Sequence, residues 1–165
     1  MAKILLTTPP WQSFHTLQVL FPNIPPLGLQ ILAGVLRAAG HDARVFSAQH
    51  LRPLHPDFIN AIEEFKPDII GFSNSELPNA PMVIKVAREV KRRYPGVKLL
   101  AGGQAPTFRP ELFLGPAGPF DAVALYEAEG TVVRIAEALA SGAALDGVPG
   151  CAWRAADGAL RRSAE

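Results

Sequence analysis

Cysteine is almost absent from this 165-residue chain, which contains only Cys151. A single cysteine excludes an internal disulfide, and it excludes the iron–sulfur and zinc sites that several cysteines of one chain would hold. An excess of charge of one sign is also missing, because 16 basic residues stand against 15 acidic ones. A nucleic-acid surface needs a clear excess of Lys and Arg, so we expect no nucleic-acid partner.

Long hydrophobic runs are missing as well, and the apolar start of the chain stops at Pro9 and Pro10. This run is too short for a secretion signal or for a membrane span. We therefore expect a cytoplasmic protein without a membrane span. Hydrophobic residues make up 48% of the chain and charged residues 19%, which is typical of one globular domain with a substantial core.

Short apolar segments alternate with segments of helical periodicity along the chain. Strands alternating with helices at this spacing indicate right-handed βαβ units and a parallel sheet. The predicted fold is α/β, a flavodoxin-like doubly wound five-stranded parallel sheet of order 2-1-3-4-5, with a C-terminal hairpin around Asp157-Gly158. The expected strands are residues 3–8, 43–48, 68–73, 97–101 and 121–125, and the expected helices include 27–39, 80–93, 109–114 and 130–141.

The helix expected over residues 27–39 is apolar almost all round. That pattern predicts burial on more than one face. Gly34 lies in the middle of this helix, where glycine is costly. We expect it there because the helix packs closely against the sheet.

Ligands of such sheets bind at the carboxyl ends of the strands, so the loops that follow the strands decide the function. The loop after the first strand, "TTPPWQSFH", contains no glycine, which argues against a flavin phosphate loop and against a GxGxxG dinucleotide site. The other loops offer small, neutral, hydrogen-bonding groups at residues 73–75, 102–107 and 126–130. They suit a large, neutral, amide-rich ligand that carries a nucleotide tail.

Gly102 and Gly103 end the fourth strand with two residues that have no side chain. Two explanations are open for this pair. Either the turn requires a positive φ, or a flat ligand presses against the main chain at this point.

Four motifs occur in a fixed order along the chain: "PPLG" at residues 25–28, "GFS" at 71–73, "GGQAPT" at 102–107 and "YEAE" at 126–129. In their order and spacing they resemble the cobalamin-binding domain that precedes the catalytic core of many radical S-adenosylmethionine enzymes. The family pattern has glycines where this chain has Tyr126 and Ala128. An aromatic side chain at Tyr126 would stack on the tail of the cofactor, cover it, or narrow the groove.

The resemblance implies a vitamin B12-binding module that holds cobalamin, a cobalt corrinoid, in its base-off form. The dimethylbenzimidazole nucleotide tail would enter the domain beside the sheet, and the corrin ring would lie over the strand ends. Gly102 and Gly103 would then have no side chains so that the tail can pass, and Gly34 would likewise leave room on the first helix. The cofactor-binding residues implied by the resemblance are Thr8, Pro9, Ser73, Asn74, Ser75, Gly102, Gly103, Gln104, Pro106, Tyr126 and Glu127.

His15 is a candidate axial ligand of cobalt, because related methionine synthase-like domains carry such a histidine after the first strand. The Asp and Gly of their motif are missing around it here, and a metal-bound histidine normally needs a partner for its second nitrogen. The alternative is a loop histidine packed among Trp11, Phe14 and Phe21.

The resemblance divides the chain into a Rossmann-like cobalamin-binding domain, residues 1–148, and a hairpin or linker, residues 149–165, that leads toward a missing catalytic domain. One cysteine cannot supply the four-iron cluster of a radical S-adenosylmethionine core. We therefore expect a non-catalytic domain that serves such a core in cis or in trans, where S-adenosylmethionine and the cluster would bind. The expected chemistry of the whole is methyl transfer or tetrapyrrole ring formation. The chain stops just after the hairpin, which favours an excised domain over a free-standing module.

Two other functions remain open from the residues. The chain could be half of a flavodoxin-like or glycosyltransferase-like enzyme that binds a nucleotide or a nucleotide-sugar through the amides of Gly102 and Gly103. It could also be an interaction domain without a ligand, whose apolar loop over residues 11–26 docks a partner.

Overall fold

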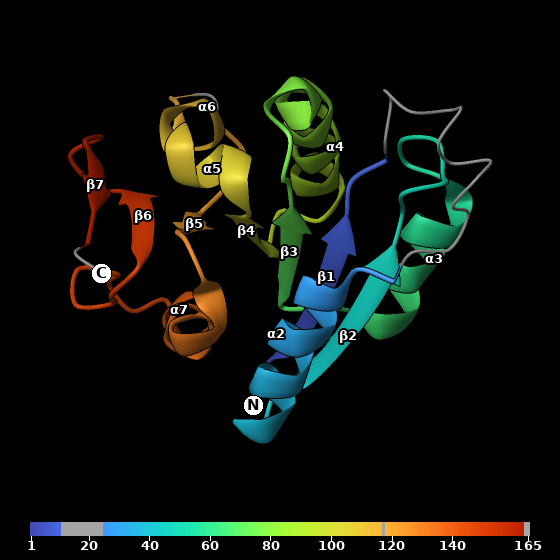
Figure 1. The fold of residues 1–165 in the computed structure, drawn as a ribbon, viewed down its shortest axis with the longest axis horizontal. Helices are drawn as coiled ribbons and strands as arrows, with labels where there is room; N and C mark the ends of the chain where they lie inside the picture. Colours follow the sequence, from blue (N-terminus) through green and yellow to red (C-terminus); the bar gives the residue numbers. More distant parts are fainter. Residues whose placement is uncertain (11–24, 117, 164–165) are drawn as a thin grey trace.

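The computed structural model describes residues 1–10, 25–116 and 118–163. These residues form an α/β domain with the element order that the sequence predicts (Figure 1). The strands are β1 (Lys3–Thr8), β2 (Asp42–Ser47), β3 (Ile69–Ser73), β4 (Lys98–Gly102), β5 (Ala122–Ala124), β6 (Cys151–Arg154) and β7 (Leu160–Arg162). The helices are α2 (Leu27–Ala38), α3 (Pro56–Phe65), α4 (Ala80–Arg93), α5 (Gln104–Phe108), α6 (Pro110–Leu114) and α7 (Val132–Ser141), with 3-10 turns η1 (Leu77–Asn79) and η2 (Ala128–Gly130).

The sheet confirms the doubly wound arrangement and extends it. Its order is β2-β1-β3-β4-β5-β6-β7, and the first five strands are parallel. The predicted hairpin is present, but it belongs to the sheet, because β6 pairs antiparallel with β5 and β7 pairs with β6. Cys151, Ala152 and Trp153 are buried in this position. The hairpin therefore covers the edge of β5, which an isolated five-stranded sheet would expose to pairing with other chains.

Two hydrophobic clusters fill the two faces of the sheet. α2 and α7 pack on one face, against side chains such as Ile4, Leu6 and Leu100. α3, α4 and α6 pack on the other, where a row of aromatic rings joins Phe46, Phe58, Phe72, Phe120 and Phe113. Figure 1 shows α2 and α7 on the opposite side of the sheet from α4, α5 and α6, with the α2 and α7 ribbons standing apart.

α2 differs from its prediction, since only one of its faces is buried. Its buried residues are Leu29, Ala33 and Leu36, whereas Leu27 is 70% and Ile31 44% exposed. The prediction for Gly34 was wrong too. That residue is exposed, and a Cβ added to it would meet nothing within 4 Å, so close packing does not explain it. α2 therefore packs on the sheet through a single buried face, and its first turn lines the cavity described below.

The loop after β4 also contains more structure than expected. The short helix predicted over residues 109–114 is present as α6, and another short helix, α5, precedes it. α5 begins directly after Gly103, so the two glycines are followed by a helical turn that returns the chain across the strand ends.

Candidate functional site

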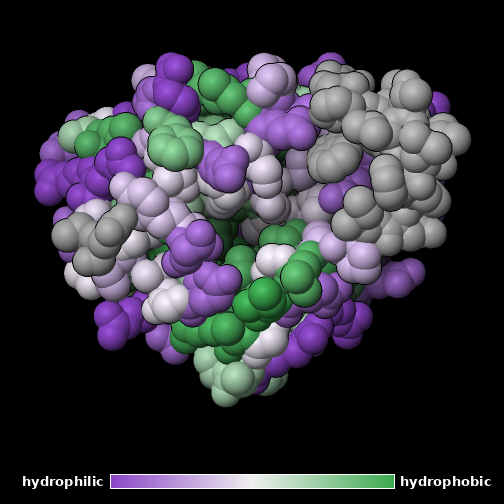
Figure 2. Space-filling model, in the orientation of Figure 1, coloured by the Kyte–Doolittle hydropathy of each residue, from purple (hydrophilic) through white to green (hydrophobic). Residues whose placement is uncertain are grey.

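A cavity of about 600 Å³ lies on the sheet face that carries α2 and α7. Leu6, Gly71, Leu100 and Ala124 form its floor, and the first three are register neighbours across β1, β3 and β4. Its walls come from α2 and α7, and its mouth lies at the carboxyl ends of the strands. Figure 2 shows the hollow near the middle of this face, with hydrophobic surface at its lower edge. A volume of this size is typical of a site for a small molecule.

The floor of the cavity combines two leucines, Leu6 and Leu100, with two small residues, Gly71 and Ala124. Gly71 is buried beneath Leu6, and a Cβ added to it would lie 2.7 Å from Leu6 Cδ2. Ala124, at the end of β5, contributes a single methyl group. The Leu6 side chain therefore fills the space above Gly71, and Ala124 leaves the floor of the slot between α2 and α7 with only a methyl group at its own position.

Gly102 and Gly103 turn out to be glycines for different reasons. Gly103 has a φ of +101°, and a Cβ added to it would lie 2.7 Å from the carbonyl oxygen of Asn74. Its place in the fold therefore demands glycine. Gly102 has no positive φ, and its added Cβ would meet nothing closer than Ala124 Cβ at 3.8 Å. Within the described residues, nothing in the protein requires position 102 to lack a side chain, although the residue lines the cavity.

Thr107 joins two loops at the mouth of the cavity. Its Oγ1 donates to the carbonyl oxygen of Gly103 at 2.9 Å and accepts from the main-chain N–H of Tyr126 at 3.0 Å. The side chain is buried, so both hydrogen bonds are protected from water. The carbonyl oxygen of Thr107 also accepts from Arg162 Nη2 at 3.3 Å, which connects the hairpin to the same point. Thr107 thereby fixes the distance between the glycine pair and the loop after β5.

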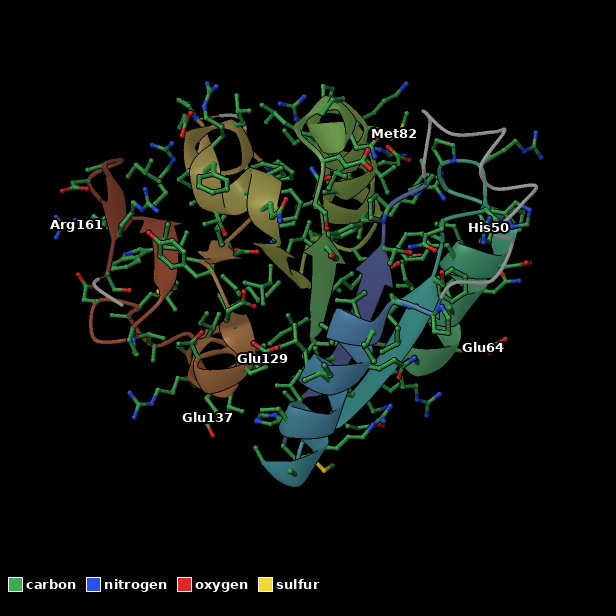
Figure 3. All side chains as sticks on the ribbon, in the orientation of Figure 1. His50, Glu64, Met82, Glu129, Glu137 and Arg161 are labelled. Carbon is green, nitrogen blue, oxygen red and sulfur yellow. The ribbon has the colours of Figure 1, made fainter. Side chains whose placement is uncertain are left out.

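Among the described residues, the charged side chains that line the cavity are acidic, and the nearby Arg162 lies on the carbonyl oxygen of Thr107. Glu127 and Glu129 line the cavity, and the described lining residues include no Lys, Arg or His. Figure 3 shows Glu129 on the α7 side, facing the space between α7 and α2. Uncharged donors and acceptors complete the mouth, among them Thr8, Ser73 and Ser75. Such a rim favours ligands that bring N–H and O–H donors and disfavours ligands with several phosphate charges.

Most of the residues proposed from the sequence gather at this cavity. Those that line it are Thr8, Ser73, Ser75, Gly102, Gly103, Gln104, Tyr126 and Glu127. Pro9, Asn74 and Pro106 are buried next to lining residues but do not line the cavity themselves. Asn74 has a main-chain role, because its N–H donates to the carbonyl oxygen of Gly102 and its carbonyl oxygen accepts from Ala105. His15 lies outside the described residues.

Several lining residues were not among the proposed contacts. Thr107 belongs to the motif at residues 102–107, so its place in the motif could have identified it as a lining residue. Glu129 was likewise quoted in a motif without being selected. Gln49 and Phe108 carried no signal, because only the folded chain brings the end of β2 and the end of α5 to the cavity.

Metal ligands and membrane spans were searched in the same residues. Within the described ranges, no group of three or more His, Cys, Asp or Glu side chains is arranged to hold a metal ion. Cys151 is buried, and its burial raises the pKa of the thiol. Over the same ranges no helix combines the length and apolar character needed to cross a bilayer.

A sequence model of the B12 binding domain matches residues 17–136. The hopanoid C-3 methylase of Methylococcus capsulatus is 35% identical over 131 residues, which is 79% of this chain and 25% of that protein. The anaerobic magnesium-protoporphyrin IX monomethyl ester cyclase of Synechocystis is 26% identical over 153 residues, 92% of this chain and 30% of the relative. The chain thus spans between a quarter and a third of the length of these curated relatives.

The radical S-adenosylmethionine methyltransferase TsrM from Kitasatospora setae, solved with cobalamin and a [4Fe-4S] cluster, superposes with a TM-score of 0.75. The match covers 99% of this chain and 29% of TsrM, at 19% identity. At that identity the likeness establishes the shared fold.

The different constraints on the two glycines can be separated by substitution. We expect Gly103→Ala to lower the free energy of unfolding by about 2 kcal/mol or more, because it combines a positive φ with a clash against Asn74. The matched change Gly102→Ala should alter it by less than about 1 kcal/mol, since the added methyl group has room. Urea denaturation of both variants measures the difference, and equal losses would contradict the assignment.

Thr107→Val should destabilise the fold by about 1–3 kcal/mol, because it keeps the shape of the side chain but leaves the Tyr126 N–H without its acceptor and removes one of the two donors to the Gly103 carbonyl, which keeps the main-chain N–H of residue 107. Thr107→Ser retains the hydroxyl and serves as the control. Chemical denaturation gives both values. If the valine variant were as stable as the serine variant, the two hydrogen bonds would not hold the loops together.

Proposed function

This chain belongs to the B12-binding domain family, and we propose that its cavity receives the nucleotide tail of cobalamin while the corrin ring lies over the mouth. Membership of the family identifies cobalamin as the ligand. The shape of the cavity supports the proposed positions of the nucleotide tail and the corrin ring. Cobalamin has a flat aromatic base at the end of a phosphate-linked ribose and carries neutral amides around its corrin. The slot has an apolar floor and a polar mouth, so each part of the ligand finds a matching surface.

The observation that carries the proposal is the open space at Gly102. Its main chain lines the cavity, its backbone conformation is available to other residues, and a Cβ there would meet only ordinary contacts. A side chain is therefore absent where the fold itself would accept one. A benzimidazole or ribose lying against the main chain at this point gives the reason, because any side chain would occupy its place.

The remaining proposed contacts follow from their positions around the slot. Thr8, Ser73 and Ser75 offer hydroxyl groups at the strand ends, and Gly103 with Gln104 begins α5 beside the mouth. Glu127 would accept hydrogen bonds from corrin amides or ribose hydroxyl groups. We assign a supporting role to the other three proposed residues, which are Pro9, Asn74 and Pro106.

A nucleotide or nucleotide-sugar ligand fits the same cavity less well. Two or more phosphate charges would face Glu127 and Glu129 without a cationic side chain among the described lining residues. The nucleotide tail of cobalamin carries a single phosphodiester, and the rest of the molecule offers amide donors that carboxylates accept. The electrostatics of the rim thus favour the corrinoid.

We propose further that the domain serves a radical S-adenosylmethionine core, supplied in the same chain or by a partner. Bound cobalamin would supply a cobalt centre that carries a methyl group or takes part in the radical reaction. Methyl transfer and tetrapyrrole ring formation are the candidate reactions, and residues 149–165 would lead toward the core. We propose a cytoplasmic location as well, because a reducing compartment keeps the cysteine thiolates that hold a four-iron cluster from forming disulfides. The proposal includes no nucleic-acid partner.

Titration with hydroxocobalamin tests the binding function directly. We expect a base-off visible spectrum, and at a hundredfold excess over the Kd a rise of the unfolding midpoint by about 5–10 °C. Gly102→Val should weaken binding by about 10- to 100-fold while the variant stays folded, because its side chain enters the space of the tail.

Gly34→Val is the matched control for this variant. It adds the same atoms at an exposed glycine of α2 that does not line the cavity, where an added Cβ would meet nothing within 4 Å. It should bind like the wild type. Unchanged affinity of a folded Gly102→Val variant would contradict the tail position, and wild-type protein without a spectral or thermal response would contradict the function.

The lower face of the cobalt is tested through His15. We expect His15→Ala to leave the visible spectrum of the cobalamin complex unchanged, since this histidine lacks the Asp partner that would orient it as a ligand. A shifted spectrum in the variant would instead identify His15 as the axial ligand.

A further inference from the structure

Tyr126 adopts a backbone conformation that a tyrosine enters only at a cost. Its φ is +52°, in the left-handed region that favours glycine. Two other non-glycine residues of the described chain share this region, and both have a visible reason. Leu54 packs against the hydrophobic cluster on the α3 side, and Lys66 ends α3, where left-handed residues are common.

No contact within the described protein explains the side chain of Tyr126. It belongs to neither hydrophobic cluster, it is 51% exposed, and no hydrogen bond of its hydroxyl group to the described residues is present. Toward the described residues, Tyr126 donates a hydrogen bond from its main-chain N–H to Thr107 Oγ1, and glycine at this position would keep that bond. The left-handed backbone at this residue is therefore not explained by a hydrophobic cluster or by a hydrogen bond of the ring to the described residues.

The ring lies at the boundary of the cavity. Tyr126 follows Ala124 of the floor by two residues, and both residues line the slot. Thr107 fixes its main chain to the loop of Gly103, so the ring stands at the same mouth as the open space at Gly102. A ligand in the slot would therefore lie near this side chain.

We propose that Tyr126 is a specificity-determining residue whose ring packs against the nucleotide tail of a corrinoid and selects corrinoids that carry such a tail. This inference rests on the proposed function and adds to it that the tyrosine ring contacts the nucleotide tail of the ligand. The tail is favoured over the corrin because the cavity, at about 600 Å³, is too small for the whole cofactor, so only the tail passes into it. The backbone strain of the empty protein is then offset by a contact that forms on binding.

Comparison of cobalamin with cobinamide, a corrinoid without the nucleotide tail, isolates this contact. Tyr126→Gly should weaken the binding of cobalamin by about ten- to a hundredfold, as expected for the loss of an aromatic stacking partner. Its affinity for cobinamide should stay at the wild-type value. Tyr126→Phe keeps the ring and should retain most of the affinity for cobalamin.

The stability of the empty protein gives a second, independent measurement. Because Tyr126→Gly relieves the left-handed strain, we expect its unfolding midpoint to rise by about 2–4 °C. Lys66→Gly is the matched control, since it relieves the same strain at an exposed residue away from the cavity. It should give a similar rise with unchanged binding of both corrinoids.

Each contrary result has a definite meaning. Wild-type affinity of Tyr126→Gly for cobalamin would overturn the inference while leaving the proposed function standing. An equal loss for cobalamin and cobinamide would overturn it too, because the ring would then contact the corrin. A lower unfolding midpoint of the empty Tyr126→Gly protein would show that the ring supports the fold. Wild-type protein that binds neither corrinoid would overturn this inference and the proposed function together.

Discussion

The domain depends on a gap that the sheet keeps open between α2 and α7. A parallel sheet normally fills such a gap with side chains, because close packing of its apolar face is what stabilises the fold. Here the floor carries Gly71 and Ala124, and α2 touches the sheet with one edge only. The opposite face is packed by the aromatic row under α3, α4 and α6, and the hairpin closes the edge of β5. The slot is therefore a cavity within an otherwise ordinary core.

The mouth of the slot shows how a few main-chain constraints can build a binding site. Gly103 turns the chain against Asn74, and Thr107 connects that turn to the loop after β5. Both residues are therefore required by the main-chain conformation at the mouth. Gly102 and Tyr126 have no such internal reason, and both face the open space. The fold does not require these two residues, and we therefore assign them to the ligand.

Much of the fold could be predicted from the sequence, since five apolar strands alternate with helices and leave few topologies. The pairing of the hairpin with the sheet could not be predicted, because it depends on contacts between β6 and β5, which are distant in the sequence. For α2, hydrophobicity all round the helix gave no sign of which flank faces a cavity and which faces solvent. The positive φ of Tyr126 and the double hydrogen bond of Thr107 arise only when two loops meet, so motif order indicated their neighbourhood but not their roles.

A crystal structure of the protein with hydroxocobalamin tests the central claim most directly. The account predicts that the benzimidazole and ribose lie between α2 and α7, within about 4 Å of the main chain of residue 102, and that the corrin ring covers the strand ends. A complex in which the base remains coordinated to cobalt outside the slot, or in which the slot is empty while corrinoid is bound elsewhere, would contradict it.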